Sequence, residues 1–128
     1  MNREETIHLL RPNIHVEKEA ESEFEKFQNE VLRPVLKLQN ELLIEIFKTY
    51  CNKRKDTFYK FSEKEKSVYI DQTVRKDMKF KHYLEGIITG MFTLDEYAKF
   101  IEFEDELTKR LINLLVQRLQ NQFKTESK

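Results

Sequence analysis

One row of apolar residues recurs at helical spacing through the first half of the chain, and it constrains the fold more than any other feature. Its members lie three or four positions apart: Phe24, Phe27, Val31, Val35, Leu38, Leu42 and Ile46. A helix with about 3.6 residues per turn places such positions on one face. Pro34 lies inside the row, and a proline within a helix removes one backbone hydrogen bond. We therefore expect a long amphipathic helix over about residues 20–53, kinked near Pro34.

Two capping boxes mark the starts of further helices. Ser62 precedes Glu65 by three residues, and Thr93 precedes Glu96 by the same interval. In this arrangement the hydroxyl and the carboxylate each accept a hydrogen bond from a backbone N–H that the helix leaves unsatisfied. Apolar residues at helical spacing follow the second box, so we expect a second long amphipathic helix over 93–123.

Internal signals leave open whether residues 62–90 and 93–123 each form one helix or two. Asp77 belongs to a residue type that caps helices, and the acidic run 102–106 separates two apolar stripes. Gly90 is a natural helix terminator.

Two further expectations concern side-chain packing around these helices. Gly86 has no side chain, and we expect it to let a neighbouring helix approach closely. Phe92 and Tyr97 flank the start of the second capping box, at the positions where a hydrophobic staple forms. We expect their side chains to pack on each other.

The composition agrees with an all-helical domain. The chain has 128 residues, of which 39% are hydrophobic and 36% charged, and it contains only 2 Gly and 2 Pro. Folds with many tight turns need more of those two residues, and no segment alternates in polarity with the period of a strand. We therefore predict an all-α bundle of four to five helices, forming a single domain over 20–123. A flexible N-terminal segment, 1–19, and a frayed tail, 124–128, would flank it.

The charged residues are arranged in blocks, although the formal net charge is zero. Residues 31–60 carry seven basic and three acidic side chains, whereas residues 83–106 carry one basic and seven acidic side chains. Such blocks are typical of helices or protomers that lie against each other, and they do not give the broad positive field of a polyanion-binding protein. The pattern favours a homo-oligomer, most simply a homodimer, or a protein partner.

The chain carries no targeting or membrane signal that we recognise. Its start is too acidic and too polar for a secretory signal, and no apolar run approaches the roughly 18 residues of a membrane span. Cys51 is the only cysteine, so an internal disulfide cannot form. We expect a cytoplasmic protein that does not contact a membrane.

The residues that could carry metal or nucleophilic chemistry do not form a coherent set. Of the three histidines His8, His15 and His82, only His8 follows a glutamate, Glu5, at the Glu-x-x-His spacing that di-metal bundles use in pairs. A cysteine such as Cys51 at a helix end more often packs than reacts. The sequence therefore predicts no metal and no cofactor, and it favours a protein that is not an enzyme.

Basic and aromatic residues interleave in two segments, 48–61 and 75–83. Cations neutralise phosphates and aromatic rings stack on bases, so this pattern indicates nucleic-acid binding as an alternative function. Core packing would account for the same aromatic residues. The candidate binding residues are Lys53, Arg54, Lys55, Arg75 and Lys76.

Several strings of residues carry a resemblance to known proteins. They are FQN at 27–29, LRPVLKLQN at 32–40, KRKDTFY at 53–59, RKDMKF at 75–80, GIITGMFT at 86–93 and KRLIN at 109–113. Over about residues 24–122 the chain resembles a small family of uncharacterised bacterial all-helical proteins. The resemblance implies an all-α fold and carries no residue role. Some members are labelled glyoxalase, which implies a small-molecule enzyme as a further alternative.

The leading functional hypothesis is a non-enzymatic protein–protein interaction or oligomerisation module. The apolar stripes on 20–53 and 93–123 are broad for a chain of this length, so we expect part of them to lie at an interface. Nucleic-acid binding and small-molecule catalysis remain the two alternatives.

Overall fold

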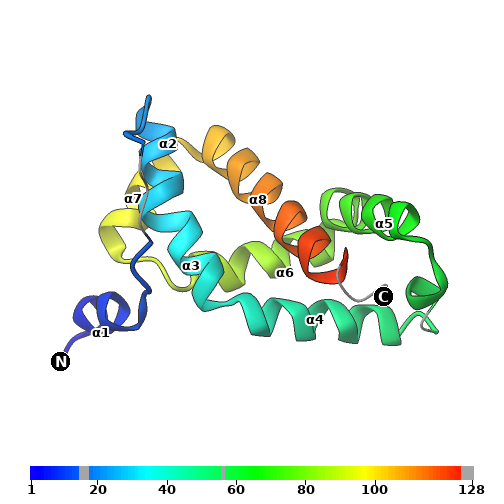
Figure 1. Ribbon diagram of the computed structural model, residues 1–128. Helices are drawn as coiled ribbons and strands as arrows, with labels where there is room; N and C mark the ends of the chain where they lie inside the picture. The colour runs from blue at the N-terminus through cyan, green and yellow to red at the C-terminus, as the bar shows by residue number, and fades with distance from the viewer. Residues whose placement is uncertain (15–17, 56, 125–128) are drawn as a thin grey trace.

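The computed structural model describes residues 1–14, 18–55 and 57–124, and over these residues it is helical without strands, which confirms the predicted all-α class (Figure 1). The elements in chain order are α1 (Arg3–Leu10), α2 (Glu23–Phe27), the π-helical turn η1 (Gln28–Leu32), α3 (Arg33–Leu38), α4 (Asn40–Asn52), the 3-10 turn η2 (Thr57–Lys60), α5 (Glu63–Lys76), α6 (Met78–Thr89), α7 (Leu94–Glu102) and α8 (Glu104–Lys124). None of the helices among these described residues combines the length and apolar character that crossing a bilayer requires.

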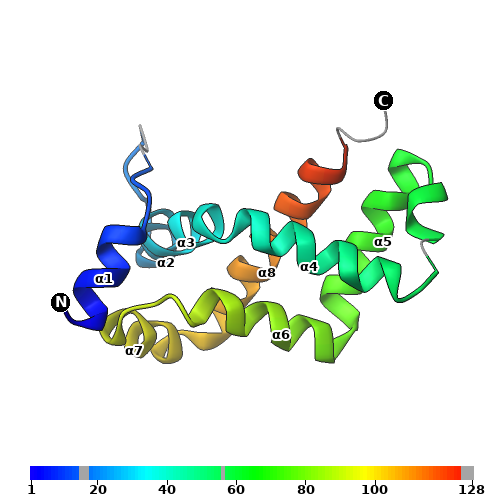
Figure 2. The same cartoon turned by 90° about the horizontal axis from the view of Figure 1, so that it is seen from below.

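The core forms where α8 packs against α5, α4 and α7. Three buried rings from separate elements meet there: Phe47 of α4, Phe58 of η2 and Phe123 of α8, with ring centroids 5.2–5.3 Å apart. Buried aromatic rings supply much of the apolar area that a small domain needs. The Phe47 ring also lies 6.3 Å from the ring of Phe80 in α6, and α6 runs antiparallel to α4, as Figure 2 shows.

The first long helical segment differs from the single kinked helix expected over 20–53. A π-helical turn covers residues 28–32, directly before Pro34, and the segment breaks again at Gln39, whose φ is −90° and ψ is 3°. Within the π turn the Arg33 N–H donates to the Gln28 carbonyl, five residues back. This wider turn accommodates a proline that has no N–H to donate, and a kink at Pro34 itself is not confirmed.

The break at Gln39 is held by a contact from outside the helix. The Gln39 Nε2 donates to the Ile87 carbonyl at 3.2 Å, near the end of α6. The chain then resumes as α4, and Gln39 links the two helices, since its N–H donates to the Val35 carbonyl and its carbonyl accepts from the Leu43 N–H, both at 2.9 Å.

Both predicted capping boxes are present, at Ser62 with Glu65 and at Thr93 with Glu96. Asp77 also caps α6, because its carboxylate accepts a hydrogen bond from the Phe80 N–H at 3.1 Å. Residues 62–90 therefore form two helices.

The expectation of one long helix over 93–123 is wrong, because α7 and α8 are separate. The break falls at Phe103, whose φ of −120° and ψ of 40° are not helical. Its ring packs edge-to-face on Phe24 of α2, with centroids 5.3 Å apart, so tertiary packing accounts for the break.

The predicted staple between Phe92 and Tyr97 does not form. Phe92 is buried and contacts the rings of Phe27 and Phe100, at centroid distances of 5.7 and 5.5 Å. Tyr97 instead points to solvent and is 51% exposed. The apolar partner of Phe92 thus comes from α2 and from the next turn of α7.

The expectation that Gly86 admits a neighbouring helix is also wrong within this chain. A Cβ built on Gly86 would meet no atom within 4 Å, because the residue lies on the exposed side of α6. Gly90 follows α6 as its C-cap, as expected, and a Cβ there would lie 3.0 Å from the Gly86 carbonyl oxygen.

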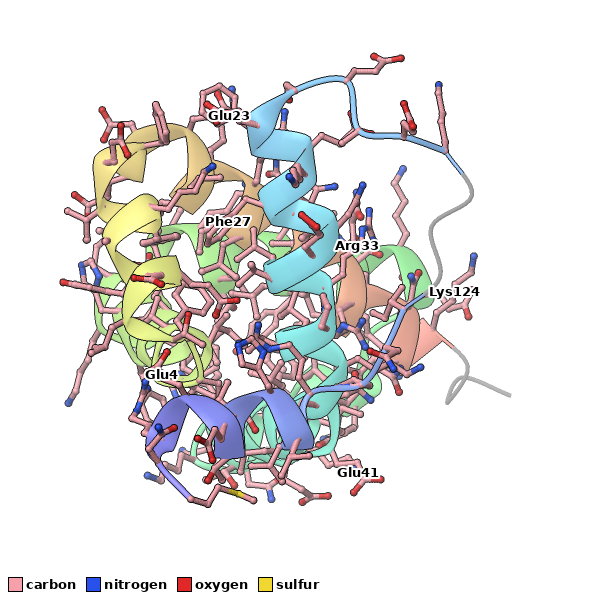
Figure 3. All side chains as sticks on the ribbon, turned by 90° about the vertical axis from the view of Figure 1, so that its left-hand side faces the viewer. Glu4, Glu23, Phe27, Arg33, Glu41 and Lys124 are labelled. Atoms are coloured by element: carbon pink, nitrogen blue, oxygen red, sulfur yellow. The ribbon has the colours of Figure 1, made fainter. Side chains whose placement is uncertain are left out.

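Residues 1–14 contain α1 and an anchored loop within the segment that the sequence suggests is flexible. The Arg11 guanidinium donates to both carboxylate oxygens of Glu96, at 2.6 and 2.9 Å, and to the Met91 carbonyl at 2.8 Å. The Glu4 carboxylate accepts from the Leu94 N–H, where α1 and α7 lie together (Figure 3). His15 and the predicted frayed tail beyond Lys124 lie outside the described residues.

Candidate interaction surface between α4 and α6

A groove with a volume of about 710 Å³ is lined by residues of α4 and α6. The two helices run antiparallel (Figure 2). The walls of the groove come from α4 and the residues after it, and from the first half of α6 with its cap. The lining residues are Leu42, Glu45, Ile46, Thr49, Tyr50, Lys53, Arg54, Asp77, Lys79, Phe80 and Tyr83. Both walls are regular helices, so the side chains that line the groove are held in fixed positions.

The groove exists because α4 has two apolar faces next to each other. Leu43 and Phe47 are buried in the core, whereas Leu42 and Ile46, each one position earlier, face the groove. Leu42 is 48% exposed and Tyr83, on the opposite wall, is 56% exposed. Apolar side chains thus remain exposed on both walls of the groove.

The residues of the predicted apolar row divide between the core and this groove. Before the break at Gln39, the row members Phe27, Val31 and Val35 are buried as expected. Their neighbours Leu32 and Leu36 are buried as well, and this second row continues at helical spacing through the break to the buried Leu43 and Phe47. After the break the second row alone stays buried, and Leu42 of the predicted row is left at the surface.

A hydrogen-bonded group closes one end of the groove. The Tyr50 hydroxyl donates to Asp77 Oδ2 at 2.8 Å, and the Arg54 guanidinium lies 3.4 Å from the centre of the Tyr50 ring and 3.8 Å from Asp77. Burial, followed by the hydrogen bond to Asp77, raises the pKa of Tyr50 to about 12. The hydrogen bonds from Tyr50 and from the Phe80 N–H lower the pKa of Asp77. At neutral pH the pair is therefore a phenol and a carboxylate.

Charge is distributed unevenly along the groove. The end that contains Tyr50 and Asp77 carries three cationic side chains, of Lys53, Arg54 and Lys79, all exposed. The other end is formed by apolar side chains, with Glu45 on its rim. A ligand that matches this surface needs apolar groups at one end and negative charge at the other.

The structure brings together the two basic segments that the sequence identified separately. Lys53 and Arg54 end α4, Lys55 follows with a φ of 64°, and the Arg54–Asp77 contact places them beside the α5–α6 junction, where Arg75 and Lys76 lie. All five are exposed. Arg75 is already paired with Asp71, at 2.8 Å.

The aromatic residues of the same two segments belong mostly to the core. Phe58 and Phe80 are buried, and Phe61 is packed against the core cluster. Of the aromatic residues in segments 48–61 and 75–83, Tyr59 and Tyr83 are the ones classed as exposed. The basic half of the predicted nucleic-acid pattern is thus at the surface, and most of its aromatic half is not.

The candidate residues for metal or nucleophilic chemistry lie apart. His8 is exposed on α1, and His82 lies 3.8 Å from Glu85 on the exposed side of α6. Cys51 is buried in the core cluster. Over residues 1–14, 18–55 and 57–124, no three or more His, Cys, Asp or Glu side chains come together as a metal-binding group.

A second exposed apolar face lies on α7, at the other end of the molecule from η2 (Figure 1). Leu94, Tyr97 and Ile101 are 70%, 51% and 42% exposed, and their spacing of three and four residues puts them on one side of the helix. Sequence spacing assigns these three residues and Phe100 to one core stripe. Of the four, the structure buries Phe100 and leaves the other three exposed.

Acidic residues border the α7 face. Asp95 and Glu102 lie on the helix, and Glu104 and Asp105 follow directly at the start of α8, all four exposed. The face on α7 is therefore apolar along its length, with one exposed acidic side chain, Asp95, at its N-terminal end and three more, Glu102, Glu104 and Asp105, at and beyond its C-terminal end.

No family model, curated protein sequence or solved structure matches this chain. The function of the α4–α6 groove must therefore be argued from its own shape and chemistry. Its shape is an open groove between two helices, and its chemistry is apolar with a cationic end.

Proposed function

We propose that this chain is a non-enzymatic protein–protein interaction module that binds an amphipathic helix of its partner in the α4–α6 groove. The observation that carries the proposal is the pair of large apolar side chains, Leu42 and Tyr83, left about half exposed on opposite walls of one groove. Burying such side chains against a partner contributes about 25 cal/mol for each Å² of apolar surface removed from water.

The dimensions of the groove suit a helix of two to three turns. From Leu42 to Lys53 the α4 wall extends about 16 Å, at a rise of 1.5 Å per residue. Helix-in-groove recognition uses apolar side chains spaced by three or four residues, which is also the spacing of Leu42, Ile46 and Thr49 along this wall. A docked helix would lie along the groove and place its apolar stripe between the two walls.

Charge defines the orientation and composition of the partner helix. Lys53, Arg54 and Lys79 surround one end of the groove, so acidic side chains at the matching end of the partner would be attracted there. An uncharged or basic amphipathic helix would bind more weakly. Because the cations are exposed, their contribution falls as salt is added.

A labelled synthetic peptide tests this proposal. The peptide is helical, carries leucines at positions i, i+3 and i+7, and ends in two glutamates. Fluorescence anisotropy should show saturable binding to the unmodified chain, and binding about tenfold weaker to Leu42→Ser and to Tyr83→Ser. The proposal fails if the peptide does not bind, or if both variants bind it as well as the unmodified chain does.

A matched variant separates a local effect from a loss of fold. Val68 lies on α5, away from the groove, and is exposed to almost the same extent as Leu42. Val68→Ser should leave peptide binding unchanged, and all three variants should keep their helical circular dichroism. Weaker binding by Val68→Ser would contradict the assignment to the groove.

Nucleic-acid binding is the second candidate, and one observation favours it. The contact between Arg54 and Asp77 brings Lys53, Lys55, Arg75 and Lys76 to one region of the surface. This function predicts that a labelled single- or double-stranded oligonucleotide is retarded at low salt, and that its affinity falls steeply as salt rises. Absence of retardation at low salt would eliminate it. Binding that survives Arg75→Gln with Lys76→Gln would eliminate this particular surface.

A further inference from the structure

We infer that the helix that occupies the α4–α6 groove is α7 of a second copy of this chain, so that the module is self-complementary. The inference rests on the proposed function, because it names the partner of the same groove. It starts from the presence, in one chain, of an apolar groove with a cationic end and an apolar helix face with an anionic end.

The apolar parts of the two surfaces correspond in order. On α4 the groove begins with Leu42 and Ile46 and ends with Lys53. On the partner surface, Leu94 and Ile101 are followed by Glu102 and then by Asp105. Leu42 and Lys53 lie eleven residues apart, about 16 Å along α4, whereas Leu94 and Glu102 lie eight residues apart, about 12 Å along α7, and Asp105 follows beyond the break at Phe103. An α7 docked parallel to α4 therefore matches apolar with apolar and negative with positive.

The charges on the two surfaces have opposite sign where this orientation brings them together. Lys53 and Lys79 of one copy would face Glu102 and Asp105 of the other, and all four side chains are exposed. Such pairs at the edge of an interface mainly select the partner and its orientation, while the apolar side chains supply most of the affinity. In this arrangement, residues of the acidic block 83–106 in one copy pair with residues of the basic block 31–60 in the other.

The α7 face is held in place before any contact forms. Glu96, on the opposite side of α7, binds Arg11 through two hydrogen bonds and completes the capping box with Thr93. Glu4 of α1 accepts a hydrogen bond from the Leu94 N–H at the start of the helix. A helix that is already formed and anchored loses little conformational entropy on docking, which favours the complex.

Charge reversal in two separate variants tests the inference. The groove variant carries Lys53→Glu and Lys79→Glu, and the helix variant carries Glu102→Lys and Asp105→Lys. Sedimentation velocity over a concentration series into the high micromolar range should show reversible association of the unmodified chain. Each variant alone should associate about a hundredfold more weakly, because like charges then face each other.

The equimolar mixture of the two variants gives the decisive result. In the mixture, the new glutamates of the groove variant face the new lysines of the helix variant. The unmodified groove of the helix variant faces the unmodified α7 of the groove variant. Both contacts are complementary, so association should return to within about tenfold of the unmodified chain. A mixture that stays monomeric overturns the inference, as does an unmodified chain that is monomeric throughout the series.

Two controls keep the outcome specific. Lys60→Glu with Lys64→Glu makes the same change of charge at exposed positions of η2 and α5 outside the groove, and it should not alter association. Leu94→Ser should weaken association without lowering the unfolding free energy, because Leu94 is 70% exposed. Equal loss of association in the Lys60 and Lys64 variant would show that net charge, rather than the groove, is responsible, and would overturn the inference.

The peptide experiment distinguishes the failure of this inference from the failure of the proposed function. If the unmodified chain is monomeric but binds the acidic leucine peptide in a manner sensitive to Leu42→Ser, the groove binds a helix from another protein and only the self-docking inference is wrong. If the peptide does not bind and the groove variant associates like the unmodified chain, both are wrong.

Discussion

Two polar anchors join parts of this chain that are far apart in sequence, and they differ in exposure to solvent. The Arg11–Glu96 pair ties α1 to α7, with its side chains 8% and 17% exposed. The Arg54–Asp77 pair ties the end of α4 to the start of α6, with its side chains 47% and 31% exposed. Removing one member of a buried pair leaves an uncompensated charge, whereas water screens an exposed pair. The first anchor therefore holds the fold, and the second shapes a surface.

The largest expected effect separates the two anchors directly. Arg11→Ala should lower the free energy of unfolding by about 3 kcal/mol, because it leaves the partly buried carboxylate of Glu96 without its cation. Arg54→Ala should lower it by less than about 1 kcal/mol. Urea unfolding followed by circular dichroism measures both values. Equal losses in the two variants would contradict the comparison.

The second largest effect should come from acid, which weakens the buried Arg11–Glu96 pair. Burial alone raises the pKa of Glu96, but hydrogen bonds from Arg11 and from Thr93 outweigh it, and the pKa lies below its ordinary value of 4.5. The unfolded chain then takes up the proton more readily than the folded one. The stabilisation by Glu96 is complete above the ordinary pKa and is lost as pH falls through the lower, folded-state pKa.

The pH dependence of unfolding in Arg11→Ala checks this expectation. Since Arg11 supplies a major part of the lowering, the variant should lose less stability than the unmodified chain on acidification below the ordinary pKa of Glu96. Other carboxylates contribute equally to both proteins and cancel in the comparison. Parallel curves for the two proteins would show that Arg11 does not control the ionisation of Glu96.

The exposed Arg54–Asp77 pair should respond to loss of the Tyr50 hydroxyl, which donates a hydrogen bond to Asp77. Tyr50→Phe removes the hydrogen bond to Asp77 and should cost about 1 kcal/mol of unfolding free energy. The same change should raise the pKa of Asp77, because the Tyr50 hydrogen bond is the largest cause of its lowering. An NMR titration of the Asp77 side-chain carbon measures this shift. Arg11→Ala should leave that titration unchanged, and a shift there would show that the two anchors are coupled.

The smallest expected effect is a gain in stability on α6. Gly86→Ala should raise the free energy of unfolding by about 0.5–1 kcal/mol, because alanine favours the helix and its Cβ meets no neighbour within 4 Å. Gly90→Ala is the matched contrast, since its Cβ would lie 3.0 Å from the Gly86 carbonyl oxygen. Thermal unfolding should rank Gly86→Ala above the unmodified chain and Gly90→Ala below Gly86→Ala. The reverse ranking would contradict the difference in exposure.

Local chemistry in the sequence predicted the starts of α5, α6 and α7. The capping boxes at Ser62 and Thr93 and the cap at Asp77 depend on side chains that bond to their own backbone within three residues, so no knowledge of the tertiary structure is needed. The break at Phe103 was harder to place, because it depends on packing against Phe24, far away in the sequence.

The candidate surface could be predicted only in part. Lys53 and Arg54 were identified from charge, and the structure places them in the wall of the groove. Leu42 belongs to the apolar row that the sequence predicts, but spacing cannot decide which of two adjacent residues, such as Leu42 and Leu43, enters the core. The choice depends on tertiary packing, since Phe47, on the same face of α4 as Leu43, contacts buried rings from η2 and α8, whereas Leu42 lines the groove.

Because neighbouring positions of α4 serve different surfaces, mutation should affect the two surfaces separately. A saturation library scored for abundance should reject polar residues at Leu43 and Phe47, tolerate them at Leu42, and give an intermediate result at Ile46, which is partly buried against the core. The same library scored for partner capture should penalise both pairs of positions. Under the proposed function, the docking specificity of the groove would be free to diverge during evolution while the interior stays constant.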